Sequence, residues 1–200
     1  MTRFVAVLLG VVVTLAVLAA LALVYVGTSG LTARGEPGPI EASVARAARS
    51  FAVPSDLRTM ANPEPRTPEV LAEALGHYAD HCAVCHGNDG SGRTPVGQGT
   101  WPKAPDMRLA ATQGLSDGEL FHVIEEGVRF TGMPGWRTGT PEGAAASWHL
   151  VHFIRHLPNL TPEELERVGT LAPRSPDDIR QEIEAEQFLQ GGDPSPVHVH

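Results

Sequence analysis

The stretch HYADHCAVCHGNDGSG, from His77 to Gly92, holds both cysteines of a 200-residue chain. Cys82 and Cys85 are three positions apart, and His86 follows the second cysteine directly. Two thiols and an imidazole at this spacing are typical of a site that holds a metal, a disulfide or a covalent cofactor. We therefore expect the fold to be organised around this Cys-x-x-Cys-His motif.

Helical patterns lie on both sides of the motif. Residues Glu69 to His81 contain one glycine and no proline, and their apolar residues gather on one side, which predicts a helix that runs into Cys82. Ser116 to Gly127 begins with a capping-box pattern and ends in glycine, and Pro141 to Leu157 ends before a proline. Between the motif and these helices, glycines and prolines from Gly87 to Gly114 predict a long loop. Because no alternating strand pattern is present, the predicted fold class is all-α.

The N-terminal region contains a run of 23 residues without a charged side chain, Phe4 to Val26. As a helix this run would be roughly 35 Å long, enough to cross a hydrocarbon core of about 30 Å. A cleaved signal sequence is the alternative, but its apolar region usually spans only about 7 to 15 residues. We therefore expect a retained, single-pass anchor, with the rest of the chain on the periplasmic or extracytoplasmic side. The expected organisation is a transmembrane anchor over residues 1–27, a linker over 28–67, a folded domain over 68–160 and an acidic helical tail over 161–200.

The charge of the chain restricts its partners. The formal net charge is −8, and the chain has a single lysine, Lys103. A nucleic acid would demand a basic surface for its phosphates, so we expect no nucleic-acid partner. Residues 161–200 hold nine acids and three arginines, which places much of the negative charge in the tail.

Several chemistries use paired cysteines, and each makes its own demand on the chain. A thioredoxin-like dithiol needs a βαβ context, whereas the motif lies between a helix and a loop. An iron–sulfur cluster usually needs four thiolates, and two cysteines are present. Zinc could take His77 and His81 as further ligands, but that leaves His86 without a role. A disulfide within Cys-x-x-Cys closes too short a loop to stabilise the fold much.

Covalent haem uses all three residues, because Cys-x-x-Cys-His is its attachment pattern. The spacing lets the sulfurs of Cys82 and Cys85 add to the two vinyl groups on one porphyrin edge, while His86 ligates the iron. One motif predicts one covalent haem c per chain.

The chain resembles the class I c-type cytochromes over roughly Pro68 to Pro158. Ala74, Tyr78 and Cys82 stand four apart and match that family's ladder of a small residue, an aromatic and a cysteine on its first helix. CHGNDGSG is similar to the family's continuation after the histidine, and SWHLVHFIRHL is similar to its terminal helix. The resemblance implies a cytochrome c fold of three to five helices around one covalent haem.

A ligand opposite His86 decides between electron transfer and small-molecule chemistry. Met133, in FTGMPGW, lies between glycine and proline just before the final helix, where close backbone approach and a fixed turn suit a thioether ligand. In the resembled family, the axial methionine occupies this place in chain order. Met60 and Met107 are less well placed, and His122 is the main rival ligand.

Ligation by His86 and Met133 would keep the iron six-coordinate and favour a relatively high potential. We therefore expect a carrier of single electrons between redox protein partners, with no catalytic residue and no small-molecule substrate. The alternative is a haem-bearing electron-transfer subunit of a membrane-bound dehydrogenase or oxidase. A third function, gas sensing or peroxidase activity, would require Met133 to be absent or labile.

Other side chains have two interpretations each. One of three prolines could orient His86 through its carbonyl, and three arginines could pair with haem propionates or simply carry surface charge. Several aromatic residues are expected to pack around the haem and between helices. Two histidine groups could bind copper, zinc or nickel, or form a polar helix face and a disordered tail. The candidate prolines are Pro95, Pro102 and Pro105, and the candidate arginines are Arg93, Arg108 and Arg137. The aromatic residues are Tyr78, Trp136, Trp148 and Phe153. The first histidine group is His149, His152 and His156, and the second is His198 and His200.

Overall fold

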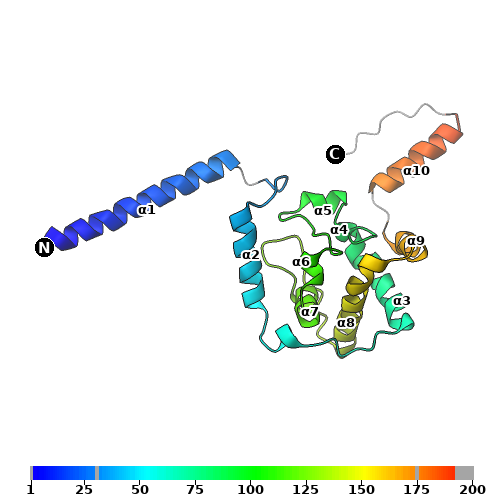
Figure 1. Cartoon of the computed structure of the whole chain (residues 1–200). Coiled ribbons are helices and arrows are strands. Elements are labelled where there is room, and N and C mark those ends of the chain that lie inside the picture. The colour runs from blue at the N-terminus through cyan, green and yellow to red at the C-terminus, as the bar shows by residue number, and fades with distance from the viewer. Residues whose placement is uncertain (1, 30–31, 174–175, 192–200) are drawn as a thin grey trace. The chain divides into compact units, whose positions relative to one another are not determined.

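The computed structural model describes residues 2–29, 32–173 and 176–191, and these ranges contain helices and no strand (Figure 1). The all-α prediction is therefore confirmed. The chain divides into two compact units, Met1–Glu36 and Pro37–His200.

The first unit is essentially one helix, α1, which spans Thr2–Ser29. Within Thr2–Thr28 the most apolar 18-residue window has a mean hydropathy of 3.0, and no other helix in the described ranges is long and apolar enough to cross a membrane. This matches the predicted apolar segment in place and length.

The second unit begins with α2, Pro39–Ala52, which lies within the range 28–67 that was expected to be a linker. A 3₁₀ turn, η1, covers Leu57–Thr59, and the extended stretch after it packs on later helices. The Gly118 N–H donates to the Met60 carbonyl at 3.2 Å, and the Asn62 side chain donates to the Trp148 carbonyl at 2.8 Å. The chain just before the folded domain is thus fastened to it.

The helix that carries the motif has three parts. α3 spans Pro68–His77 and begins at Thr67, whose hydroxyl accepts a hydrogen bond from the Val70 N–H. It continues into the π-helical turn η2, Tyr78–Cys82, and then into α4, Ala83–His86. Gly87 ends the helix with a φ of 77°, a conformation that favours glycine.

The predicted long loop contains two single-turn helices, α5 at Pro95–Gly99 and α6 at Ala110–Gln113. α7 spans Asp117–Glu126, and its predicted capping box is present, with Ser116 and Glu119 exchanging side-chain and backbone hydrogen bonds. α8 spans Pro141–His156 and runs into the 3₁₀ turn η3, Leu157–Asn159.

The core lies where α3 and η2 pack against α8. Tyr78 and Phe153 are fully buried, with ring centroids 4.9 Å apart, and Phe121 stacks on Trp148 at 4.1 Å. The expected packing of Tyr78, Trp148 and Phe153 between helices is therefore confirmed.

The range that was expected to form an acidic helical tail contains two helices in its described part. α9 spans Pro162–Leu171 and starts with a capping box between Thr161 and Glu164. Val168 on α9 is fully buried in the core, so this helix packs on the domain. α10 spans Pro176–Leu189.

Candidate metal centre

The Cys-x-x-Cys-His motif lies at the change from a π-helical turn to an α-helical one. The Ala83 N–H donates to the Tyr78 carbonyl, five residues back, which is the π-helical pattern. Single π turns inside α-helices are frequent at functional sites. The extra residue in this turn shifts the helix register just before Cys85 and His86. These two residues therefore lie on a different face from the one they would occupy if α3 continued as a regular α-helix.

Tyr78 anchors the far end of the motif. Its hydroxyl donates to the Gly87 carbonyl at 2.6 Å, one residue after His86, and its ring lies in the core. Burial is the main reason that the pKa of the phenol is raised well above its usual range, so the hydroxyl keeps its proton and its donor role. The side chain therefore connects the core to the position of His86.

The two thiols are half-buried and not joined by a disulfide. Burial, with a smaller effect of Cys85, raises the pKa of Cys82 to about 12, and burial also raises the pKa of Cys85. Catalytic dithiols need a low thiol pKa, so these thiols are poorly suited to thioredoxin-like exchange.

His86 presents a neutral imidazole. Burial lowers its pKa, and the Pro105 carbonyl partly opposes that shift. Nδ1 is buried and has no hydrogen-bond partner, so Pro105 lies near the ring without completing a hydrogen bond. Neutral imidazole is the form that ligates metals. Of the three candidate prolines, Pro105 is the one whose carbonyl acts on His86.

Met133 lies half-buried in the loop between α7 and α8. Its N–H donates to the Thr131 hydroxyl at 3.0 Å, and its carbonyl accepts from the Val128 N–H at 3.1 Å. Gly127 has a φ of 67°, and a Cβ there would come within 2.7 Å of the Met133 carbonyl oxygen. The loop thus turns back tightly on the end of α7, at a position that only glycine fits.

A buried carboxylate fastens the chain after Met133. The Trp136 and Arg137 N–H groups donate to the carbonyls of Ile124 and Glu125 at 3.0 and 3.1 Å. The buried Glu125 side chain accepts a hydrogen bond from the Ser147 hydroxyl at 2.6 Å and lies 3.5 Å from the Arg137 Nε atom. One carboxylate therefore connects α7, the methionine loop and α8.

An aromatic contact links the methionine loop to the cysteine helix. His81, the residue before Cys82, stacks on Trp136 with ring centroids 4.9 Å apart. Trp136 is partly exposed, unlike the other aromatic residues that were expected to pack inside the domain. The segments that carry the cysteines and Met133 are therefore adjacent.

The rival methionines have other surroundings. Met107 is only 6% exposed and belongs to the core, and its carbonyl accepts a hydrogen bond from the Gln113 side chain. Met60 is 39% exposed in the stretch that packs on α7. His122 is half-buried on α7.

Two of the three candidate arginines already bind carboxylates. Arg108 donates to Asp89 at 2.8 Å and to Asp106 at 2.7 Å. Arg137 pairs with Glu125 and Glu126. Arg93 is exposed.

The histidines of α8 do not form a metal site. His149 lies 3.8 Å from Glu64 and 3.5 Å from Glu73, His152 contacts the Glu64 carbonyl, and His156 contacts Glu164 at 2.9 Å. His152 and His156 thus have hydrogen-bond partners, whereas His149 lies near two carboxylates and its buried Nδ1 has no hydrogen-bond partner. Within the described ranges, no group of three or more His, Cys, Asp or Glu residues could hold a metal ion. The C-terminal candidates, His198 and His200, lie outside the described residues.

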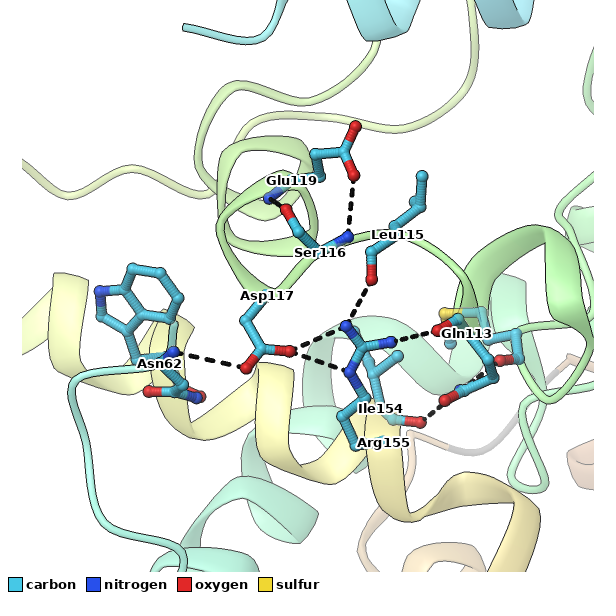
Figure 2. Close-up of polar contacts among 10 residues, drawn as sticks. Asn62, Gln113, Leu115, Ser116, Asp117, Glu119, Ile154 and Arg155 are labelled. Carbon is cyan, nitrogen blue, oxygen red and sulfur yellow. Dashed lines mark hydrogen bonds and ion pairs between the residues drawn. The ribbon is translucent and has the colours of Figure 1, made fainter. Parts of the chain in front are cut away.

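A polar network that the sequence analysis missed fastens α8 to the start of α7 (Figure 2). Arg155 donates to the Asp117 carboxylate at 2.8 Å and to the carbonyls of Gln113 and Leu115. The Asn62 N–H donates to the other Asp117 oxygen at 3.3 Å. The one sequence signal was an arginine on an otherwise apolar and histidine-rich helix, and its partners are about 40 positions away.

Comparison with known proteins agrees with this geometry. Residues 69–154 match the family described as cytochrome C oxidase, cbb3-type, subunit III, and this range contains the motif and Met133. No curated protein matches the chain. Two half-buried neutral thiols and a half-buried imidazole whose buried Nδ1 has no hydrogen-bond partner suit a covalently attached haem. The chain therefore contains a c-type cytochrome domain over residues 69–154.

Proposed function

We propose that this protein is a membrane-anchored, monohaem c-type cytochrome that carries single electrons between redox proteins. The observation that carries the proposal is the placement of Cys82, Cys85 and His86 on one helical stretch, with a buried His86 nitrogen that has no partner. A bound haem supplies one-electron chemistry at its iron.

Each site residue has a distinct role in this proposal. Cys82 and Cys85 hold the cofactor through thioether bonds, and their neutral thiols stay protected from competing exchange until they react. His86 and Met133 would hold the iron. Pro105 orients the His86 ring, and Tyr78 fixes the backbone just after it.

Met133 decides the type of chemistry. A thioether ligand from Met133 would leave no open site at the iron for oxygen or peroxide, so the protein would pass electrons and would not transform a small molecule. The tight turn at Gly127, together with the Glu125 contact, supports a fixed position for this side chain.

The location follows from α1. We infer that it stays in the mature chain as a single membrane span, with the cytochrome domain on the periplasmic or extracytoplasmic side. Covalent haem attachment takes place on that side.

The decisive experiment is haem staining of the denatured protein on a gel. The unmodified chain should keep one haem, whereas the double variant Cys82→Ala, Cys85→Ala should lose it. Met133→Ala is the matched control, because it leaves both thioethers in place and should stain fully. Loss of bound zinc in the double variant, with no haem in the unmodified chain, would overturn the proposal.

A second candidate is an electron-transfer subunit of a membrane oxidase, favoured by the family match, whose description names an oxidase subunit. Detergent extraction followed by native size analysis separates the two functions. A carrier should migrate alone, and a subunit should co-migrate with other chains.

A further inference from the structure

The helix that follows the membrane segment has an apolar stripe that no described residue covers. Ile40, Val44 and Phe51 on α2 are 81%, 63% and 85% exposed, and no residue of this helix is buried. With 3.6 residues per turn, these three and Ala47 lie within an arc of about 60°. A continuous exposed stripe of this kind needs an apolar environment.

The side of α2 opposite the stripe is the less exposed one. The half-buried residues of the helix, Ala42 and Arg49, are about 170° from the centre of the stripe. Glu41, about 90° from the stripe, accepts a hydrogen bond from the Trp101 indole at 3.2 Å. A flat surface can therefore reach the stripe without meeting the domain.

We propose that α2 lies in the surface of the same membrane that holds α1, with its apolar stripe in the lipid. Residues 30–38 join the two helices, and nine residues extend to about 30 Å at most. This short connection keeps α2 beside the bilayer whatever the relative placement of the two units.

The charge of the segment around α2 also favours a membrane surface as its partner, rather than a basic protein that binds the acidic chain. Residues 32–59 carry four arginines and three acidic residues, whereas the whole chain has a net charge of −8. Anionic headgroups therefore attract this segment and repel the remainder. Because Glu41 binds Trp101, a membrane-bound α2 would also orient the cytochrome domain at the surface.

The inference depends on retention of α1, which belongs to the proposed function, but not on the haem ligands. A test uses the full-length haem protein in liposomes that contain anionic lipid. A nitroxide is attached at Val44→Cys, on the stripe, or at Ala45→Cys, which is exposed about 130° from the stripe centre. Collision with oxygen reports lipid, and collision with a water-soluble nickel chelate reports solvent.

We expect a several-fold higher ratio of oxygen to nickel collisions at position 44 than at position 45. Equal, water-like ratios at both positions, in protein whose N-terminus is intact by mass, would overturn the inference alone. Dipolar broadening at position 44 would assign the stripe to a second copy of the chain and would also overturn it. If the nitroxide also labels the unmodified protein, Cys82 and Cys85 are free thiols and hold no haem. That result would contradict the proposed function.

Discussion

At the scale of single residues, the two sides of the candidate centre are built differently. His86 is positioned within a helix, next to a buried hydroxyl–carbonyl hydrogen bond between Tyr78 and Gly87. Met133 is positioned by a loop whose shape depends on Gly127 and on the side chain of Glu125. The histidine side is therefore secured by the core, and the methionine side by a few polar contacts.

Replacing Met133 tests the distal side directly. In Met133→Ala, water or an imidazole should enter the sixth position, and the reduction potential should fall because neutral sulfur stabilises reduced iron. The near-infrared band from sulfur-to-iron charge transfer should disappear. Met107→Ala is the control: it should cost about 2–5 kcal/mol of folding free energy as a core truncation, yet keep the band. A band that survives in Met133→Ala would favour another ligand, with His122 first.

Replacing Glu125 tests whether the buried carboxylate positions Met133. Glu125→Gln weakens the hydrogen bond from Ser147 and the pairing with the half-exposed Arg137, which should cost about 1–2 kcal/mol of folding free energy. As the pH is raised, the charge-transfer band should then bleach at a lower pH than in the unmodified protein. It should also bleach at lower concentrations of added imidazole.

The matched control for Glu125→Gln is Asp117→Asn. This variant weakens a different carboxylate contact with α8, the one between Asp117 and Arg155. This variant should lose comparable stability without moving the pH at which the band bleaches. If both variants shift that pH equally, Glu125 acts on global stability and has no positioning role.

At the scale of elements, local signals predicted the helices well and their contacts poorly. The Ser116–Glu119 capping box and the proline after α8 are signals within a few residues, and both ends form as expected. The π turn at Tyr78–Cys82 has no such signal, because it depends on how Tyr78 packs between α3 and α8. The hydrogen bonds between Ser147 and Glu125 and between Arg155 and Asp117 join residues 22 and 38 positions apart, which periodicity does not reveal.

The attachment of α9 should depend on pH through Glu164. Burial alone would raise the pKa of Glu164, but hydrogen bonds from Thr161 and His156 outweigh it and hold the pKa below 4.5. A lowered carboxyl pKa contributes stability above its unfolded value, and that stability is lost as the pH falls through the folded value. Amides of α9 should therefore exchange faster relative to α8 below about pH 4.5 than at pH 7.

Glu164→Gln serves as the control for this dependence. The variant should exchange faster already at pH 7 and should change less on acidification. An unmodified protein whose α9 amides keep the same relative protection from pH 7 to pH 3 would contradict the role of the contact between His156 and Glu164.

At the scale of the whole molecule, the chain consists of one apolar helix and one compact unit with its own core. Among the described residues, none of the core belongs to α1, since the buried apolar residues lie between Val53 and Val168. The folding of the cytochrome domain and the attachment to a membrane are therefore separable properties of this chain.

This separation predicts the effect of removing α1. A variant in which residues 1–29 are replaced by a cleavable export signal should keep the optical spectrum and the reduction potential of the full chain, because the ligand-bearing segments lie in the second unit. It should leave the membrane in a carbonate wash, whereas the full chain should need detergent, since a 27-residue helix whose most apolar 18-residue window has a mean hydropathy of 3.0 favours lipid strongly. Mass analysis of the extracted full chain should find residues before Gly27. Full-chain protein that is soluble and begins near Leu21 or Leu23 would show instead that α1 is a cleaved signal, and the inference about α2 would then lose its tether.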